Sequence, residues 1–139
     1  MEKIKALFIK KIKSSTRKEL QKHIKRIVNK YNLSYAGFVT KVGGAAGRPL
    51  IYYPKNLTIQ KELCGKTVGI VNEITDLKIS NMENFSEITL SNAQEFLYLK
   101  EVISPILFYC VSNSKLQLKK VRKFISKNEE QIKEIFTKD

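Results

Sequence analysis

The sequence predicts an α+β fold: a three-layer sandwich in which a five-stranded antiparallel sheet carries one helix on one face and two on the other. The first observation is the order of apolar periodicities along the 139 residues, which runs α-β-β-α-β-β-β-α. The second is that the strand candidates are joined by short turns, which favours antiparallel neighbours. The third is that some strand candidates are apolar on both faces, so helices must cover both sides of the sheet.

Residues 1–14 form a basic amphipathic N-terminal segment that precedes a single domain at residues 15–139. Its apolar residues fall on one helical stripe, and lysines surround that stripe. One interpretation is that the segment docks on the domain. The alternative is that it contacts an anionic membrane or an acidic partner, through Lys3, Lys5, Phe8, Lys10, Lys11 and Lys13.

The first long helix is predicted to begin at Thr16, where Thr16 and Glu19 have the spacing of a capping box. Leu20, Ile24 and Ile27 follow at helical spacing and form a core-facing stripe up to Asn32.

The segments 35–41 (YAGFVTK) and 49–54 (PLIYYP) are predicted to form a hairpin. Prolines at both ends of the second segment suit an edge strand. The glycine-rich connection VGGAAGR is not followed by a helix start, which argues against a phosphate-binding loop. We assign a partner-contact loop to Gly43, Gly44, Gly47 and Arg48.

Residues 58–78 are predicted to form the second long helix, with Thr58 as its cap. The Gly65-Lys66-Thr67 triplet is not a Walker motif, because the position of the leading glycine holds Gln60. Gly65 and Gly69, four residues apart, predict a flat groove on one helix face where another backbone can approach. The alternative interpretation is a helix break at Gly65.

Three strand candidates follow, at residues 85–91, 95–103 and 105–111. In the first, Ile88 and Leu90 face one side and Glu87 and Thr89 the other, and no proline protects the strand. We therefore expect an edge that is free to pair. The third is continuously apolar, as a central strand should be, and residues 115–136 close the domain as a third long helix.

The formal net charge of +13 is concentrated at the two ends of the chain: +9 in residues 1–30 and +4 in residues 115–139. Such a charge attracts nucleic acid, anionic lipid or acidic protein. It is carried by 22 Lys and only 4 Arg, which weakens the case for specific phosphate or base contacts; an AT-rich genome would also produce this bias. No apolar run approaches the roughly 20 residues of a membrane span, so we expect a cytoplasmic, at most membrane-peripheral, protein.

No catalytic, cofactor or metal site is expected. His23 is the only histidine, Cys64 and Cys110 lie far apart in apolar surroundings, and no paired carboxylates occur. An enzyme is therefore the weak interpretation, and the two cysteines are expected to be buried thiols.

The pattern over residues 15–127 resembles the roadblock (dynein light chain roadblock-type) family, within the wider roadblock and longin-like grouping. The resemblance rests on the helix before YAGFVTK, the hairpin into PLIYY, the long second helix and the meander SEITLSNAQEFLYLKEVISPILFYCVSN that runs into LKKVRKFI. The first hairpin departs from the family, which often has a tight Asp-Gly turn where this chain has VGGAAGR.

The resemblance implies a non-enzymatic homodimer that binds a Ras-like small GTPase or serves as a scaffold, with no cofactor. It implies pairing through the second helix and the third strand, at Gly65, Val68, Gly69, Asn72, Ile88 and Leu90. Two alternatives remain open at this point: a nucleic-acid-binding protein that uses its basic terminal helices, and a profilin-like actin-binding protein.

Overall fold

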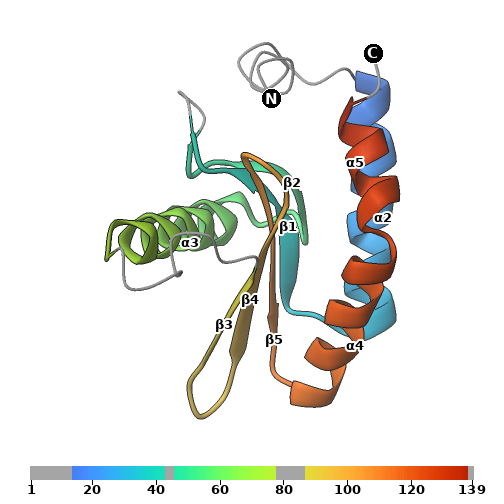
Figure 1. Cartoon of the computed structure of the whole chain (residues 1–139). Coiled ribbons are helices and arrows are strands. Elements are labelled where there is room, and N and C mark those ends of the chain that lie inside the picture. Colours follow the sequence, from blue (N-terminus) through green and yellow to red (C-terminus); the bar gives the residue numbers. More distant parts are fainter. Residues whose placement is uncertain (1–13, 43–45, 78–86, 138–139) are drawn as a thin grey trace.

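A computed structural model describes residues 14–42, 46–77 and 87–137 of the chain. The sheet has the strand order β2-β1-β5-β4-β3, and every neighbouring pair is antiparallel (Figure 1). The five-stranded antiparallel sheet predicted from the sequence is thereby confirmed. The elements are α2 (Ser14–Tyr31), β1 (Tyr35–Thr40), β2 (Pro49–Tyr53), α3 (Leu57–Leu77), β3 (Glu87–Ser91), β4 (Phe96–Ile103), β5 (Ile106–Ser112), α4 (Lys115–Lys127) and α5 (Glu129–Thr137).

Helices cover the two faces of the sheet unequally. Helix α3 lies on one face, whereas α2, α4 and α5 lie together on the other (Figure 1). Strand β5 is central and buried along its whole length, as its continuous apolar sequence predicts. The proline-flanked β2 and the alternating β3 are the two edges, which also agrees with prediction.

The larger core lies between the sheet and helices α2, α4 and α5. Phe38 of β1 is at its centre, 5.7 Å from the ring of Phe108 and 5.0 Å from the ring of Phe136, both in edge-to-face geometry. The stripe residues Leu20 and Ile24 of α2 have no exposed surface. Each such side chain contributes about 1.5–3 kcal/mol relative to an exposed one, so this packing holds α2 and α5 on the sheet.

The smaller core lies under α3, where Cys64, Val68 and Val71 pack on the sheet. It contains a buried polar contact: the hydroxyl of Tyr109 donates to Oε1 of Gln60 at 2.6 Å. Nε2 of Gln60 in turn donates to the carbonyl of Pro54 at 3.1 Å. Both ends of the buried Gln60 amide are therefore bonded, which offsets its desolvation.

Helix α2 also closes the β2 edge of the sheet. Nη1 of Arg17 donates to the carbonyl of Leu50 at 2.7 Å, and Nε2 of Gln21 donates to the carbonyl of Tyr52 at 2.8 Å. Backbone groups that a neighbouring strand would otherwise bond are thus satisfied by side chains.

The predicted helix starts are wrong at both caps. Ser14 is already helical, so Thr16 lies inside α2 and is buried there rather than capping it. At α3 the cap is Asn56, whose Oδ1 accepts from the amide of Ile59 at 3.3 Å, and not Thr58. Both threonines lie within two residues of the true start, where helical pattern alone does not fix a boundary.

The closing helix is also divided, where a single helix was predicted. It ends at Lys127 and resumes at Glu129, with Asn128 at φ −106° and ψ 11° between the two parts. The side-chain amide of Asn128 donates to the carbonyl of Phe124 at 2.8 Å and satisfies the end of α4.

Candidate interaction surfaces

The outer face of α3 is open at both predicted glycines. Gly65, Gly69 and Asn72 are exposed, and a Cβ atom built on either glycine would have no neighbouring atom within 4 Å. The helix runs unbroken from Leu57 to Leu77, which excludes the alternative of a break at Gly65. Gly65 and Gly69 are one helical turn apart, so together they leave a flat strip without side chains, on which a second backbone can approach closely.

Val68 does not belong to this outer face, contrary to prediction. Its exposed fraction is 7%, and it packs with Cys64 and Val71 against the sheet. Its spacing of three from Gly65 puts Val68 about 60° away around the helix, at the margin of the predicted stripe, and this margin faces the sheet.

The β3 edge lies next to a groove that α3 also lines. Ile88 is partly buried opposite Leu99, whereas Leu90, opposite Leu97, is 40% exposed. An open groove of about 290 Å³ joins Leu90 and Leu97 to Leu63 of α3. In the described part of the chain, no strand pairs with the outer edge of β3. Of the predicted interface residues, Leu90 lines this groove, whereas the glycines of α3 lie on another side of the helix from Leu63.

The turn after β1 lies beside α3. Gly47 adopts φ +79°, a conformation that favours glycine, and a Cβ atom there would be 3.6 Å from Cα of Gly65. Arg48 lies next to it and is exposed. Gly43 and Gly44, the other members of the predicted contact loop, lie outside the described residues. The described half of that loop therefore borders the α3 strip.

Charge is separated between the two helical faces. Helix α2 carries six basic side chains and one acidic, and α4 carries six basic and none acidic. Helix α3 carries two basic and three acidic, for a net charge of −1. Two copies of the chain would therefore repel each other across the α2 and α4 face and meet little repulsion across the α3 face.

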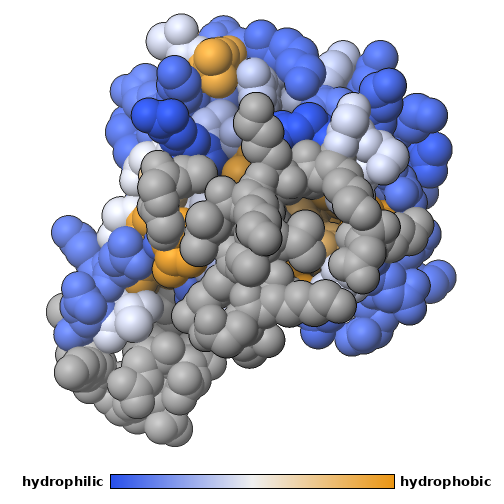
Figure 2. All heavy atoms as spheres, turned by 90° about the horizontal axis from the view of Figure 1, so that it is seen from above, coloured by the Kyte–Doolittle hydropathy of each residue, from blue (hydrophilic) through white to orange (hydrophobic). Residues whose placement is uncertain are grey.

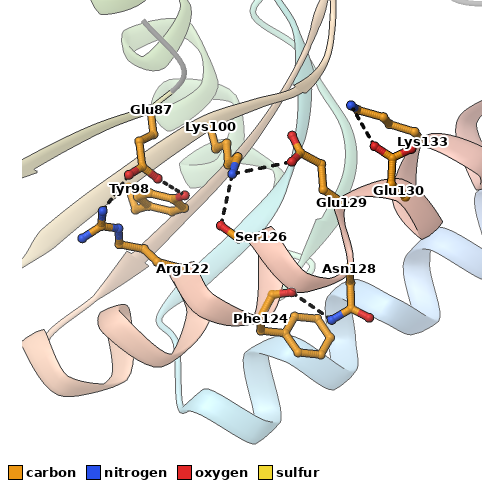
Figure 3. A network of polar contacts seen from close by, with 10 residues as sticks. All are labelled: Glu87, Tyr98, Lys100, Arg122, Phe124, Ser126, Asn128, Glu129, Glu130 and Lys133. Atoms are coloured by element: carbon orange, nitrogen blue, oxygen red, sulfur yellow. Dashed lines mark hydrogen bonds and ion pairs between the residues drawn. The ribbon is translucent and has the colours of Figure 1, made fainter.

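A polar network connects the first residue of β3 to α4 (Figure 3). The carboxylate of Glu87 accepts from the hydroxyl of Tyr98 and from Nη2 of Arg122, each at 2.6 Å. Burial raises the pKa of Glu87, but these two hydrogen bonds and the charges of Arg122 and Lys100 outweigh it, so the pKa is lowered from its usual value. Burial and the Glu87 carboxylate together raise the pKa of Tyr98.

The same network continues along β4 to the junction of the last two helices. Nζ of Lys100 donates to Oγ of Ser126 at 3.2 Å and lies 3.9 Å from a carboxylate oxygen of Glu129 (Figure 3). The end of α4 and the start of α5 are thus both tied to β4, and the edge strand β3 is tied to α4.

The groups with chemical reactivity lie apart from one another in the described residues. Cys64 and Cys110 are free and buried, as predicted, and burial raises the pKa of the Cys64 thiol to about 12. Burial and the charge of Arg26 lower the pKa of the half-buried His23, which is therefore neutral at about pH 7. Within residues 14–42, 46–77 and 87–137, no three His, Cys, Asp or Glu side chains gather as a metal site.

The large apolar side chains that are exposed in the described residues are Val42, Leu57, Ile59, Leu90 and Leu116. Viewed from above, the described residues are mainly hydrophilic, with small apolar patches between them (Figure 2). None of the helices described is both long and apolar enough to cross a membrane. The six residues predicted to contact a membrane or acidic partner, from Lys3 to Lys13, lie outside the described residues.

Three features of these surfaces were not predicted. The sequence shows no sign that Tyr98, Glu87 and Arg122 meet, because they are brought together by the pairing of β3 with β4 and the seating of α4. Nor does it show the cover of β2 by Arg17 and Gln21. The break at Asn128 did have a signal, because an Asn followed by two Glu has the composition of a helix start.

Comparison with known proteins identifies the architecture. No protein-family model and no curated protein sequence matches the chain. Among solved structures it is similar to MglB of Myxococcus xanthus, at 19% identity over 93% of this chain and 97% of that one, with a TM-score of 0.73. An MglB with a tetrameric arrangement gives a TM-score of 0.74 at 16% identity, covering 89% of this chain and 92% of that one.

A Roadblock/LC7 domain from Streptomyces avermitilis matches at a TM-score of 0.52 and 7% identity, over 68% of this chain and 86% of that one. At these identities the similarities establish the fold. The chain therefore has the roadblock fold, and the predicted resemblance is confirmed at that level.

Proposed function

We propose that the chain is a non-enzymatic homodimeric adaptor or regulator that binds a Ras-like small GTPase. The roadblock fold supports a regulatory role, and an MglB with a tetrameric arrangement supports self-association. The dispersed reactive groups support a binding function rather than catalysis.

The observation that carries the dimer is the edge of β3, unpaired in the described residues, which adjoins a groove shared with α3. The near-neutral outer face of α3 has two exposed glycines, and the free edge of β3 lies across the groove lined by Leu63 and Leu90. In the proposed dimer the edges of two β3 strands pair, and the glycine strips of the two α3 helices pack beside them. Such an interface satisfies the backbone groups of β3 and buries Leu90.

Light scattering coupled to gel filtration tests the dimer. We expect a mass of about twice the 16.0 kDa of one chain, and Gly69→Leu should shift it toward the monomer by obstructing the strip. The matched control is Asn29→Leu, an apolar substitution at an exposed position of α2. A monomer at high protein concentration would refute the proposal, and an unaffected Gly69→Leu dimer would refute the α3 interface.

The GTPase partner requires a separate experiment. Small GTPases loaded with GDP or with a non-hydrolysable GTP analogue are passed over the immobilised protein, and GTP hydrolysis is recorded in a parallel assay. We expect binding that depends on the nucleotide, and the acceleration or slowing of hydrolysis then separates a regulator from a passive adaptor. Equal retention of both nucleotide forms and of an unrelated control protein would count against this function.

The basic face of α2 and α4 supports a second part of the proposal, that the protein works in the cytoplasm next to an anionic membrane. Most of the lysines on this face have no carboxylate partner in the described part of the chain. Flotation with vesicles rich in anionic lipid should retain the protein at low salt and release it as salt rises. Stronger retention by duplex or single-stranded nucleic acid at equal salt would favour the nucleic-acid alternative instead.

A further inference from the structure

A cavity of about 300 Å³ lies between α2 and the α4–α5 pair, away from the α3 face. These helices lie side by side over the same face of the sheet (Figure 1), and Phe38 of β1 is among the residues that line the cavity. The dimer and GTPase proposals make no use of this space.

The inner part of the cavity is apolar. Leu20 and Phe38 are almost fully buried, and the isoleucines Ile27, Ile132 and Ile135 line it from the two sides. The volume is at the lower limit of typical ligand pockets and about twice that of an engineered cavity of about 150 Å³ that binds benzene. It is therefore suited to one short chain or one ring, and too small for a lipid with two chains.

The rim on α2 is basic. His23, Arg26 and Lys30 are spaced by three and four residues, so they lie on the same side of the helix. Nζ of Lys30 is 5.4 Å from the ring centre of Tyr31 and 5.7 Å from that of Phe124, which holds the ammonium beside the cavity. Arg26 and Lys30 have no carboxylate partner in the part of the chain that the structure describes.

The opposite rim is polar but uncharged. It is formed by Asn128, at the break between α4 and α5, and by Gln131. None of the described residues that line the cavity is acidic. A ligand with one compact anionic head would thus meet two cations and two amides, and its apolar body would meet only apolar side chains.

We propose that this cavity binds a single-chain amphiphilic anion, of the class of medium-chain fatty acids, with the carboxylate at Arg26 and Lys30 and the chain against the apolar wall that includes Ile27 and Ile132. The complementarity of charge and the narrow apolar interior select this class. A neutral alcohol of the same length lacks the ionic contact, and a phospholipid is too large for the space.

The test is a titration of the full chain with octanoate, and with 1-octanol for comparison, followed by calorimetry and by methyl NMR. Octanoate should bind with a dissociation constant of about 0.1–1 mM and shift the methyl signals of Ile27, Ile132 and Ile135. The methyl signals of Val71, on the opposite face of the sheet, should not move. Octanol should bind at least about threefold more weakly.

Arg26→Gln combined with Lys30→Gln should weaken octanoate binding about fivefold and leave octanol binding unchanged. The matched control is Lys18→Gln with Lys22→Gln, which removes the same charge from exposed positions of α2 that do not line the cavity. The control should bind octanoate as the wild type does.

Four results would overturn the proposal: no binding of octanoate, equal binding of octanol, equal weakening by both double variants, or methyl shifts confined to the α3 face. Because none of the four depends on dimerisation or on a GTPase, this site and the proposed function can fail separately.

Discussion

The hydroxyl of Tyr109 on β5 and Oε1 of Gln60 on α3 are 2.6 Å apart in the middle of the smaller core. This hydrogen bond ties α3 to the sheet through polar groups. Tyr109→Phe should destabilise the domain by about 1–3 kcal/mol, because it leaves Oε1 of Gln60 buried without a donor. Urea unfolding at about pH 7 measures the loss. Tyr35→Phe, whose hydroxyl makes no hydrogen bond in the described structure, should change stability by far less.

Position 37 of β1 requires glycine, because neighbouring atoms leave no room for a side chain. A Cβ atom at this position would be 2.6 Å from the Tyr109 hydroxyl oxygen and closer still to the carbonyl oxygen of Ile51. Gly37→Ala should therefore cost at least about 3 kcal/mol, or prevent folding, because strand and ring must both shift. Thermal unfolding followed by circular dichroism measures this loss of stability. A Gly37→Ala variant as stable as the wild type would contradict the packing described for β1.

The substitution Gly69→Ala on α3 should raise the stability of a monomer and lower the stability of a dimer. In an isolated chain the methyl group of Gly69→Ala meets nothing, and the helix gains about 0.5–1 kcal/mol. In a dimer packed on this strip, the same methyl group lies between two backbones and lowers stability. Thermal unfolding over a wide range of protein concentrations distinguishes the two, because only the dimer has a concentration-dependent midpoint.

The carboxylate of Glu87 makes stability depend on pH. Its pKa in the folded chain is below the usual 4.5. Its contribution is therefore fully present above about pH 4.5 and is lost as the pH falls through the lower folded pKa. Glu87→Gln should cost about 0.5–1 kcal/mol at about pH 7 and progressively less as the pH falls from about 4.5 through that folded pKa. Glu130→Gln, which removes an exposed partner of Lys133, serves as control and should have little effect at either pH. Equal losses for Glu87→Gln at neutral and acid pH would show that the charge is not involved.

The two thiols should be unreactive in the folded protein. Burial raises the pKa of Cys64 to about 12 and raises that of Cys110 as well. At about pH 8 the thiolate fraction of Cys64 is then about 1 in 10,000. Modification by a disulfide reagent should proceed only as fast as the chain unfolds, and it should be rapid in concentrated guanidinium. Fast labelling of the native protein would contradict this burial.

The strands were predictable from the sequence because each carries its own signal. Alternation in 87–91 and continuous apolar sequence in 106–112 identify an edge and a centre, and prolines identify the other edge. The surface of α3 was predictable in part, since two glycines spaced by four leave one side of a helix without side chains. Val68 was misplaced because helical spacing puts it at the margin of the glycine stripe, and spacing alone does not show that this margin packs on the sheet.

The features that could not be predicted depend on distant pairs. Lys100 meets Ser126 and Glu129 only after β4 and the last helices are packed, and no local pattern encodes this. The cavity beneath Arg26 is similar: its walls are ordinary core stripes, and the space forms where α2 meets the break at Asn128. Periodicity shows which side of a helix is buried, but not how tightly two buried sides meet.

The cover that Arg17 and Gln21 place on the carbonyls of Leu50 and Tyr52 limits how many copies can join. A sheet with two open margins can add strands without end, and the product is a fibre. Here the β3 margin can accept a strand, whereas carbonyls of the far margin are already bonded by the chain's own side chains. Pairing through β3 would therefore stop at two chains. The two β3 edges bond to each other, and no free edge is left to which a third chain could add a strand.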